Sequence, residues 1–175
     1  MTDEFACCFT GYRPEKFNFD FTPGTPEYTQ FENNLTDAIY RMADRGCGVF
    51  YSGVAQGFDI AAAEIVLLRR RLQGDVVLRC ALPFREQAAK WELSWKRRYL
   101  EVLKAADEII ILSDNYYKGC FARRNRYMVE RSRAVITYFD GAAGGTASTL
   151  QMAERRGLEV INIYDPYQQL ALELP

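Results

Sequence analysis

Short apolar segments alternate with longer amphipathic segments along the whole chain. Most of the short segments are continuously apolar rather than alternating, which is typical of parallel strands covered on both faces. They are rich in β-branched and aromatic residues, and six of them are predicted to be strands: residues 5–9, 48–51, 76–82, 108–112, 134–139 and 160–164.

The segments between these strands carry apolar residues at helical spacing. The first helix is expected to begin at Thr25 and Pro26, a capping residue followed by proline, and to end at Gly46. Further helices are predicted over residues 59–72, 86–106, 121–131 and 146–156, with a short one over 167–174. This alternation predicts a single Rossmann-like α/β domain over residues 1–175, with a doubly wound, mainly parallel sheet and helices on both faces.

The helix expected over residues 86–106 carries an aromatic ridge. Trp91, Trp95, Tyr99 and Val102 recur at helical spacing. Such a ridge is more often part of the core than a ligand platform. A wide aromatic surface is also compatible with a homodimer formed through this helix face.

Length and composition agree with one globular domain. The chain has 175 residues, of which 49% are hydrophobic and 26% charged. No apolar stretch approaches the roughly 18 to 20 residues of a membrane helix, and the first five residues include two acids where a signal peptide would be basic. We therefore expect a soluble, cytoplasmic protein with no membrane partner.

The chain contains no histidine. This excludes Ser-His-Asp triads, Cys-His dyads and zinc sites with histidine ligands. The five cysteines form no C-x-x-C pair, so we expect buried thiols and no metal site. Any catalysis must therefore use carboxylates, tyrosine, lysine, cysteine or bound water.

The near-neutral net charge does not exclude a local anion-binding site. The formal net charge is −1, which argues against general coating of nucleic acid. Arginine nevertheless supplies 17 of the 22 basic residues, and its planar guanidinium suits a bidentate grip on phosphate.

Candidate chemistry lies directly after three of the strands, where open α/β sheets bind their ligands. Two of these loops are built of small residues and lead straight into helices, so their backbone amides are expected to bind phosphate. Neither matches the G-x-G-x-x-G or the G-x-x-x-x-G-K-[ST] pattern. The ligand-binding candidates are Gly11, Tyr12 and Arg13 after the first strand, Ser52, Gly53, Val54, Ala55, Gln56, Gly57 and Asp59 after the second, and Asp140, Gly144, Gly145 and Thr146 after the fifth.

Three of these candidates have alternative roles. Asp59 either hydrogen-bonds a ribose hydroxyl or caps its helix. Arg13 either holds a phosphate or a base, or forms a surface salt bridge, and its position after the first strand favours the ligand. Asp140 either orients water or ribose, or simply starts the turn before Gly141.

These loops resemble a known superfamily. Residues 52–63, SGVAQGFDIAAA, resemble a segment of the DNA-processing protein DprA, and residues 144–150, GGTASTL, resemble a second glycine loop shared by DprA and the LOG phosphoribohydrolases. Together these loops define the SLOG superfamily of Rossmann-like domains. The stretches TGYRP (10–14), LPF (82–84) with Gln87, and RNRYMV (124–129) resemble the YpsA-like family of unknown function within it.

The resemblance implies a ligand and further site residues, but not a reaction. It implies that a nucleotide or nucleotide derivative binds in the sheet crevice, and it places Arg124 and Asn125 there. The cofactor is not identified by the sequence, and we expect that none is required. From spacing alone, both residues would be predicted to face solvent. The LOG enzymes use a glutamate three residues beyond the threonine of their glycine loop, and this chain has Thr149 at that position.

Three functions are therefore compatible with the sequence. The leading hypothesis is a sensor or regulator that binds a nucleotide or an ADP-ribose-like molecule and is not an enzyme. The second is a nucleotide N-glycosidase in which Asp59, Asp140 or Glu64 activates water. The third is a DprA-like module that binds nucleic acid, which requires a basic groove with stacking aromatics.

Overall fold

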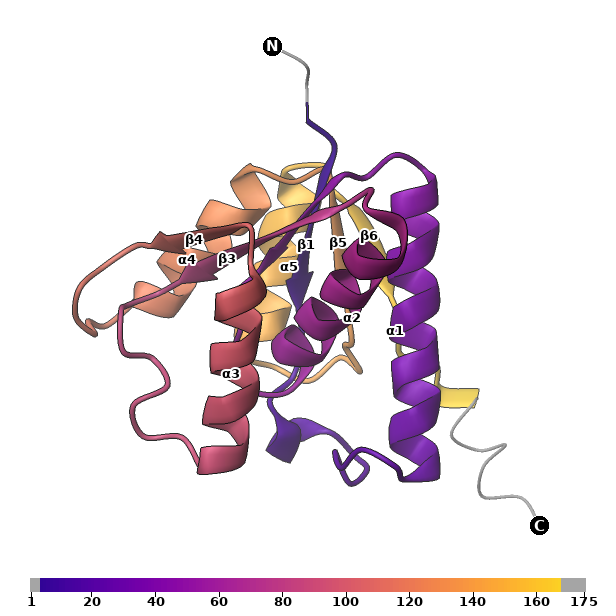
Figure 1. Cartoon of the computed structure of the whole chain (residues 1–175), viewed down its shortest axis with the longest axis horizontal. Helices are drawn as coiled ribbons and strands as arrows, with labels where there is room; N and C mark the ends of the chain where they lie inside the picture. Colours follow the sequence, from indigo (N-terminus) through magenta and orange to yellow (C-terminus); the bar gives the residue numbers. More distant parts are fainter. Residues whose placement is uncertain (1–3, 168–175) are drawn as a thin grey trace.

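Six parallel strands form a sheet at the centre of the protein (Figure 1). The computed structural model describes residues 4–167. The sheet has the order β4-β3-β2-β1-β5-β6, and every neighbouring pair is parallel, as predicted. The strands are β1 (Ala6–Thr10), β2 (Val49–Ser52), β3 (Val77–Leu82), β4 (Glu108–Ile111), β5 (Ala134–Thr137) and β6 (Glu159–Asn162).

Helices cover both faces of this sheet (Figure 1). One layer contains α1, α2 and α3, which pack side by side, and the opposite layer contains α4 and α5. The helices are α1 (Pro26–Asp44), α2 (Phe58–Gln73), α3 (Leu93–Ala105), α4 (Cys120–Glu130) and α5 (Gly145–Arg155), with a short 3₁₀ turn at Pro14–Lys16. Within residues 4–167, no helix has the length and apolarity needed to cross a membrane.

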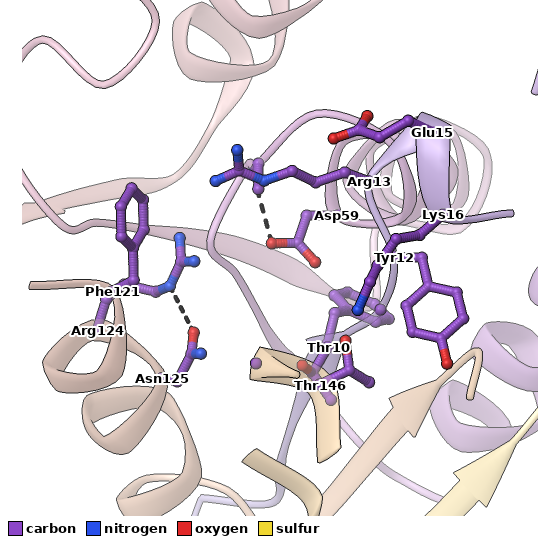
Figure 2. A pocket seen from close by; sticks show the side chains of 14 residues that line it. Thr10, Tyr12, Arg13, Glu15, Lys16, Asp59, Phe121, Arg124, Asn125 and Thr146 are labelled. Atoms are coloured by element: carbon purple, nitrogen blue, oxygen red, sulfur yellow. Dashed lines mark hydrogen bonds between the residues drawn. The ribbon is translucent and has the colours of Figure 1, made fainter. Parts of the chain in front are cut away.

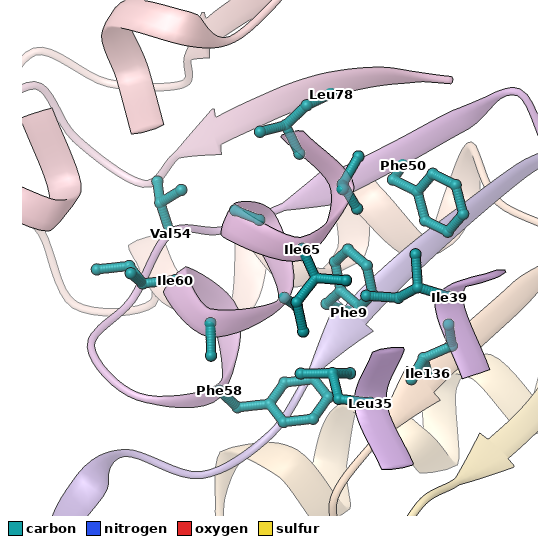
Figure 3. Close-up of a cluster of buried hydrophobic side chains, with 14 of the residues drawn as sticks. Phe9, Leu35, Ile39, Phe50, Val54, Phe58, Ile60, Ile65, Leu78 and Ile136 are labelled. Atoms are coloured by element: carbon teal, nitrogen blue, oxygen red, sulfur yellow. The ribbon is translucent and has the colours of Figure 1, made fainter. Parts of the chain in front are cut away.

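The central strands are buried on both faces. In β1, Cys7 and Phe9 face the core under α1 and α2, while Ala6 and Cys8 face the core under α4 and α5. This follows from the period-two alternation of side chains in a strand. The first core is the larger one, and Figure 3 shows Phe9 among its apolar neighbours from α1, α2 and the adjacent strands.

One predicted helix boundary is wrong. Helix α3 begins at Leu93 rather than at Glu86. The preceding residues form turns in which the amides of Ala89 and Trp91 donate to carbonyls three residues earlier. Glu92 then adopts an extended conformation that cannot continue a helix. The short helix expected over residues 167–174 lies outside the described residues, apart from Tyr167.

The aromatic ridge of α3 packs inward. Tyr99 and Val102 are buried, and the Trp91 ring lies 5.2 Å from the Tyr99 ring, centroid to centroid. The Trp95 ring stacks on Phe21 at 6.4 Å. These contacts confirm the prediction that the ridge belongs to the core, while a homodimer through this face stays a prediction.

The five cysteines are free and buried, as the sequence predicts. Burial raises the pKa of Cys47 to about 11 and that of Cys80 to about 12. Thiols with such pKa values are protonated at neutral pH and are poor nucleophiles.

The conformation of Gly57 allows the loop after β2 to pack closely against the loop after β1. Its φ of +93° is a conformation that side chains disfavour. The next amide, that of Phe58, donates to the Tyr12 carbonyl at 3.1 Å. A Cβ on Gly57 would lie 2.6 Å from that carbonyl oxygen, so only glycine allows this close approach.

Substitution of Gly57 should therefore destabilise the fold more than substitution of Gly46. Gly46 also has a positive φ, +96°, but no atom lies within 4 Å of the position its Cβ would take. We expect Gly57→Ala to lower the free energy of unfolding by about 1 to 3 kcal/mol more than Gly46→Ala, measured in urea. Equal losses would contradict the close contact.

Candidate functional site

A cavity of about 440 Å³ opens at the carboxyl ends of β1, β2 and β5 (Figure 2). The chain leaves β1 for the α1 layer and leaves β5 for the α5 layer, so the cavity lies at the point where the winding of the sheet reverses. Fourteen residues line it: Phe9, Thr10, Gly11, Tyr12, Arg13, Glu15, Lys16, Ala55, Asp59, Phe121, Arg124, Asn125, Gly145 and Thr146.

The cavity brings together nine of the residues expected from the sequence. They are Gly11, Tyr12, Arg13, Ala55, Asp59, Arg124, Asn125, Gly145 and Thr146. The other candidates, Ser52, Gly53, Val54, Gln56, Gly57, Asp140 and Gly144, are not among its lining residues. Five lining residues were missed from the sequence, namely Phe9, Thr10, Glu15, Lys16 and Phe121. The sequence offered a clue to Lys16 and Phe121. Each lies three residues from an arginine candidate, Lys16 from Arg13 and Phe121 from Arg124, in a segment that follows a strand.

The first glycine loop uses its polar groups within the protein. The Val54 amide donates to the Ser52 hydroxyl at 3.1 Å, and the Ala55 amide donates to the Asp59 carboxylate at 3.4 Å. The Ser52 hydroxyl itself donates to the Asp59 carbonyl at 3.0 Å. The amides of Val54 and Ala55 are therefore already bonded within the loop.

The second glycine loop is arranged differently. Helix α5 begins at Gly145, directly after Gly144, whose φ is +147°. The first amides of a helix have no acceptor within the helix and form the positive end of its dipole. Gly145 and Thr146 line the cavity, so this helix end faces it. The Lys16 ammonium lies beside the same loop and donates to the Ala143 carbonyl at 3.2 Å.

Arg124 links the two glycine loops. Its guanidinium donates to the Gly53 carbonyl at 2.8 Å and to the Asn125 side-chain oxygen at 2.7 Å. The Asn125 amide group donates to the Thr149 hydroxyl at 2.9 Å, which in turn donates to the Gly145 carbonyl at 2.9 Å. A continuous chain of hydrogen bonds therefore connects the two loops through Arg124, Asn125 and Thr149. Figure 2 shows the bond between Arg124 and Asn125.

Asp59 is a buried carboxylate among positive groups. Burial raises its pKa to about 6, although Arg124, the Ala55 amide and Arg13 all favour the charged form. In Figure 2 the Asp59 carboxylate lies below the Arg13 side chain and to the right of the Arg124 guanidinium. The cavity thus holds three cationic side chains, Arg13, Lys16 and Arg124, against the carboxylates of Asp59 and Glu15.

The Phe121 ring forms an aromatic wall beside these cations. The Arg13 guanidinium carbon lies 5.6 Å from the ring centroid, and that of Arg124 lies 5.9 Å from it. Both distances are within the range of cation–π contacts. An aromatic ring in this position offers a stacking surface for a flat ligand group.

The other two catalytic candidates lie outside the cavity. Asp140 accepts hydrogen bonds from the Tyr12 hydroxyl and from the Ala142 amide, and these contacts, led by the tyrosine, lower its pKa. Glu64 forms a two-bond ion pair with Arg98, at 2.7 and 3.0 Å. Of the three carboxylates considered, only Asp59 lines the cavity. Among residues 4–167, no group of three or more cysteine or carboxylate side chains is placed to hold a metal ion.

A parallel sheet with a cavity at the point where its winding reverses is typical of a Rossmann-like domain. The chain belongs to the YpsA family, described as the YspA SLOG family, whose model matches residues 7–164. A UPF0398 protein of Halalkalibacterium halodurans is 25% identical over 150 residues, which cover 84% of this chain and 79% of the relative. The uncharacterized SPbeta prophage-derived protein YoqJ of Bacillus subtilis is 32% identical over 118 residues, which cover 61% of this chain and 69% of YoqJ.

Solved structures of DprA share the fold. DprA from Streptococcus pneumoniae has a TM-score of 0.59 and 18% identity and matches 90% of this chain, which spans 50% of the DprA chain. DprA from Helicobacter pylori, solved to describe its single-stranded DNA binding mode, has a TM-score of 0.58 and 20% identity, with 97% of this chain and 72% of that chain covered. At these identities the likeness concerns the fold alone.

Replacing Asp59 by Asn should change how stability depends on pH. The folded-state pKa of about 6 exceeds the value of about 3.9 for Asp in an unfolded chain. Between these values the folded state binds more protons, so the free energy of unfolding falls as the pH rises from about 4 to about 6, by up to about 2 to 3 kcal/mol. The Asn variant should lack this fall and be more stable than the parent at pH 7.

Urea titrations of both proteins between pH 4 and pH 7 measure this difference. A matched control is Asp37→Asn, at a position on α1 where the Asp37 side chain is 57% exposed, which should leave the pH dependence in place. If the free energy of unfolding of the parent and of Asp59→Asn depended on pH in the same way, the raised pKa of Asp59 would be contradicted.

Proposed function

We propose that this protein binds a nucleotide or an ADP-ribose-like derivative in the cavity and acts as a sensor or regulator. The observation that carries the proposal is the N-terminal end of α5, which faces the cavity at Gly145 and Thr146. Three cations lie around the same space, and such helix ends are common anion sites. The first glycine loop contributes by positioning Arg124 through the Gly53 carbonyl, while its Val54 and Ala55 amides are bonded within the loop.

The phosphates of the ligand are best accommodated at the end of α5. The amides of Gly145 and Thr146 supply directed donors, while Arg13 and Lys16 add positive charge from the segment after β1. Arginine recognises phosphate through paired N–H groups, and lysine acts as a point charge. Arg124 adds a third charge from the opposite wall.

The remaining groups suit a sugar and a ring. Asp59 is a buried acceptor when ionised and suits a ribose hydroxyl, which can donate to it. Phe121 offers its ring to a base. A cavity of about 440 Å³ lies within the range of small-molecule sites.

Binding without turnover is favoured by the surroundings of Thr149. This residue, at the position of the LOG glutamate, is 2% exposed and bonded to both Asn125 and Gly145. Its hydroxyl positions the loops and has no carboxylate chemistry to offer. The N-glycosidase alternative rests on Asp59, whose pKa of about 6 suits proton transfer near neutral pH.

Gly145→Asp should abolish or strongly weaken nucleotide binding. No atom lies within 4 Å of the position that a Cβ on Gly145 would take, so a side chain fits without displacing the protein. An aspartate there would repel phosphate at close range, and at a helix N-terminus it would not harm the helix. Calorimetry with ADP-ribose should show at least about 10-fold weaker binding than for Gly145→Asn, which has the same size without the charge.

Two results would contradict the proposed function. One is equal affinity of the Asp and Asn variants for ADP-ribose. The other is stronger binding of a single-stranded oligonucleotide than of ADP-ribose by the parent protein, with a steep salt dependence. That second result would favour a nucleic-acid module.

Base release from nucleoside monophosphates should be far slower than typical turnover. We expect less than about 1 release per second when AMP is incubated with the protein and adenine is measured by chromatography. Release at about 1 s⁻¹ or faster, lost in Asp59→Asn, would establish the N-glycosidase alternative instead. Glu64→Gln serves as the control, because Glu64 lies outside the cavity and its loss should not alter release.

A further inference from the structure

A second cavity, of about 480 Å³, lies between the loop after β3 and the loop after β4. Its lining residues include the aromatic side chains Phe84, Trp91 and Tyr116, and the polar side chains Gln87, Asp114 and Asn115. Both loops follow the carboxyl ends of their strands, so this cavity opens at the same edge of the sheet as the first one.

Two sets of contacts make this cavity a direct neighbour of the first. The Phe121 ring, which lines the first cavity, lies 6.1 Å from the Phe84 ring and 6.4 Å from the Tyr116 ring, which line the second. The Gly53 carbonyl accepts one hydrogen bond from Arg124 in the first cavity and another from Gln87 in the second, at 2.8 and 3.2 Å. The two cavities therefore share a wall.

Hydrogen bonds join the two loops beside the second cavity and stabilise the loop after β4. The Arg85 amide donates to the Ser113 carbonyl at 3.1 Å, and the Arg85 guanidinium pairs with Asp114 at 3.0 Å. The Ser113 hydroxyl donates to the Asn115 carbonyl at 2.8 Å. The backbone bond therefore links the two loops, while the ion pair is solvent-exposed and adds little stability.

The charge of the second cavity differs from that of the first. Its charged lining residues are Glu86, Asp114 and Lys90, two acids and one base. This balance disfavours a phosphate. The Tyr116 ring lies 5.7 Å from the Phe84 ring, centroid to centroid. Tyr116 is 64% exposed, so its ring is accessible to a ligand. The amide group of Asn115 can bond the polar edge of a flat ring.

We propose that the ligand is a dinucleotide whose pyrophosphate and first nucleoside occupy the first cavity, while its second ring stacks on Tyr116, beside Phe84, in the second cavity. This inference rests on the proposed function and names the ligand class for the same site. A ligand that passes the edge of Phe121 reaches these two rings next. The second nucleoside of this ligand carries no additional phosphate group, because the second cavity has no excess of positive charge.

Calorimetry with two matched ligands tests the inference. ADP-ribose ends in a bare ribose, and diadenosine 5′,5′-pyrophosphate carries an adenine at that place. The parent protein should bind the diadenosine compound about 10-fold more tightly, since stacking of a base on an aromatic side chain has an effect of this size. Tyr116→Ala should remove this preference and leave the affinity for ADP-ribose within about twofold, whereas Tyr116→Phe should retain the preference. Tyr117→Ala, a neighbour outside the cavity lining, is the control and should behave as the parent.

The outcomes separate this inference from the function on which it rests. If ADP-ribose binds and the second adenine adds nothing, or if Tyr116→Ala leaves the preference intact, the second subsite is wrong and the proposed function stands. If neither ligand binds the parent protein, the proposed function fails and the dinucleotide inference fails with it.

Discussion

The site depends on one buried positive charge, the guanidinium of Arg124. Its residue is only 5% exposed, and its hydrogen-bond acceptors are the neutral oxygens of Gly53 and Asn125. Among residues 4–167, no carboxylate lies within ion-pair distance of it. Arg69, which is equally buried, instead pairs directly with Asp44 and Asp75. Arg124 is thus held in place while its charge remains available to the cavity.

This arrangement explains why the two glycine loops have different roles. A Cβ on Gly53 would lie 2.2 Å from the Arg124 guanidinium, so this glycine makes room for the arginine rather than for a ligand. Gly145 has open space at the corresponding position and begins a helix whose first amides face the cavity. The first loop therefore fixes the charge, and the second offers the donors. Asp59 balances part of that charge, at the cost of an elevated pKa.

Much of the fold was predictable because each strand is a compact apolar run and each small-residue loop follows a strand end. The same reasoning brought Arg13 and Gly145 to one sheet edge. The start of α3 was not predictable, because the apolar periodicity already begins in the turns before Glu92, whose extended backbone separates those turns from the helix. Only the family resemblance pointed to Arg124, since its spacing on α4 does not reveal that it is buried against another loop.

The remaining site residues depend on contacts between distant segments. The Phe121 ring contacts the guanidinium groups of Arg13 and Arg124. The Lys16 ammonium donates to the Ala143 carbonyl, more than a hundred residues away in sequence. The exclusion of Asp140 and Glu64 likewise follows from their partners Tyr12 and Arg98. Such pairings follow from the three-dimensional arrangement and leave no local pattern.

The most direct test of the central claim is an NMR titration of the protein with ADP-ribose, followed through the backbone amides. We predict that the amides of Gly145 and Thr146 shift most, because they are the open donors at the end of α5. The amides of Val54 and Ala55, which are bonded within the first loop, should shift less. Larger shifts in the first loop than in the second, or no shift in either, would contradict the account.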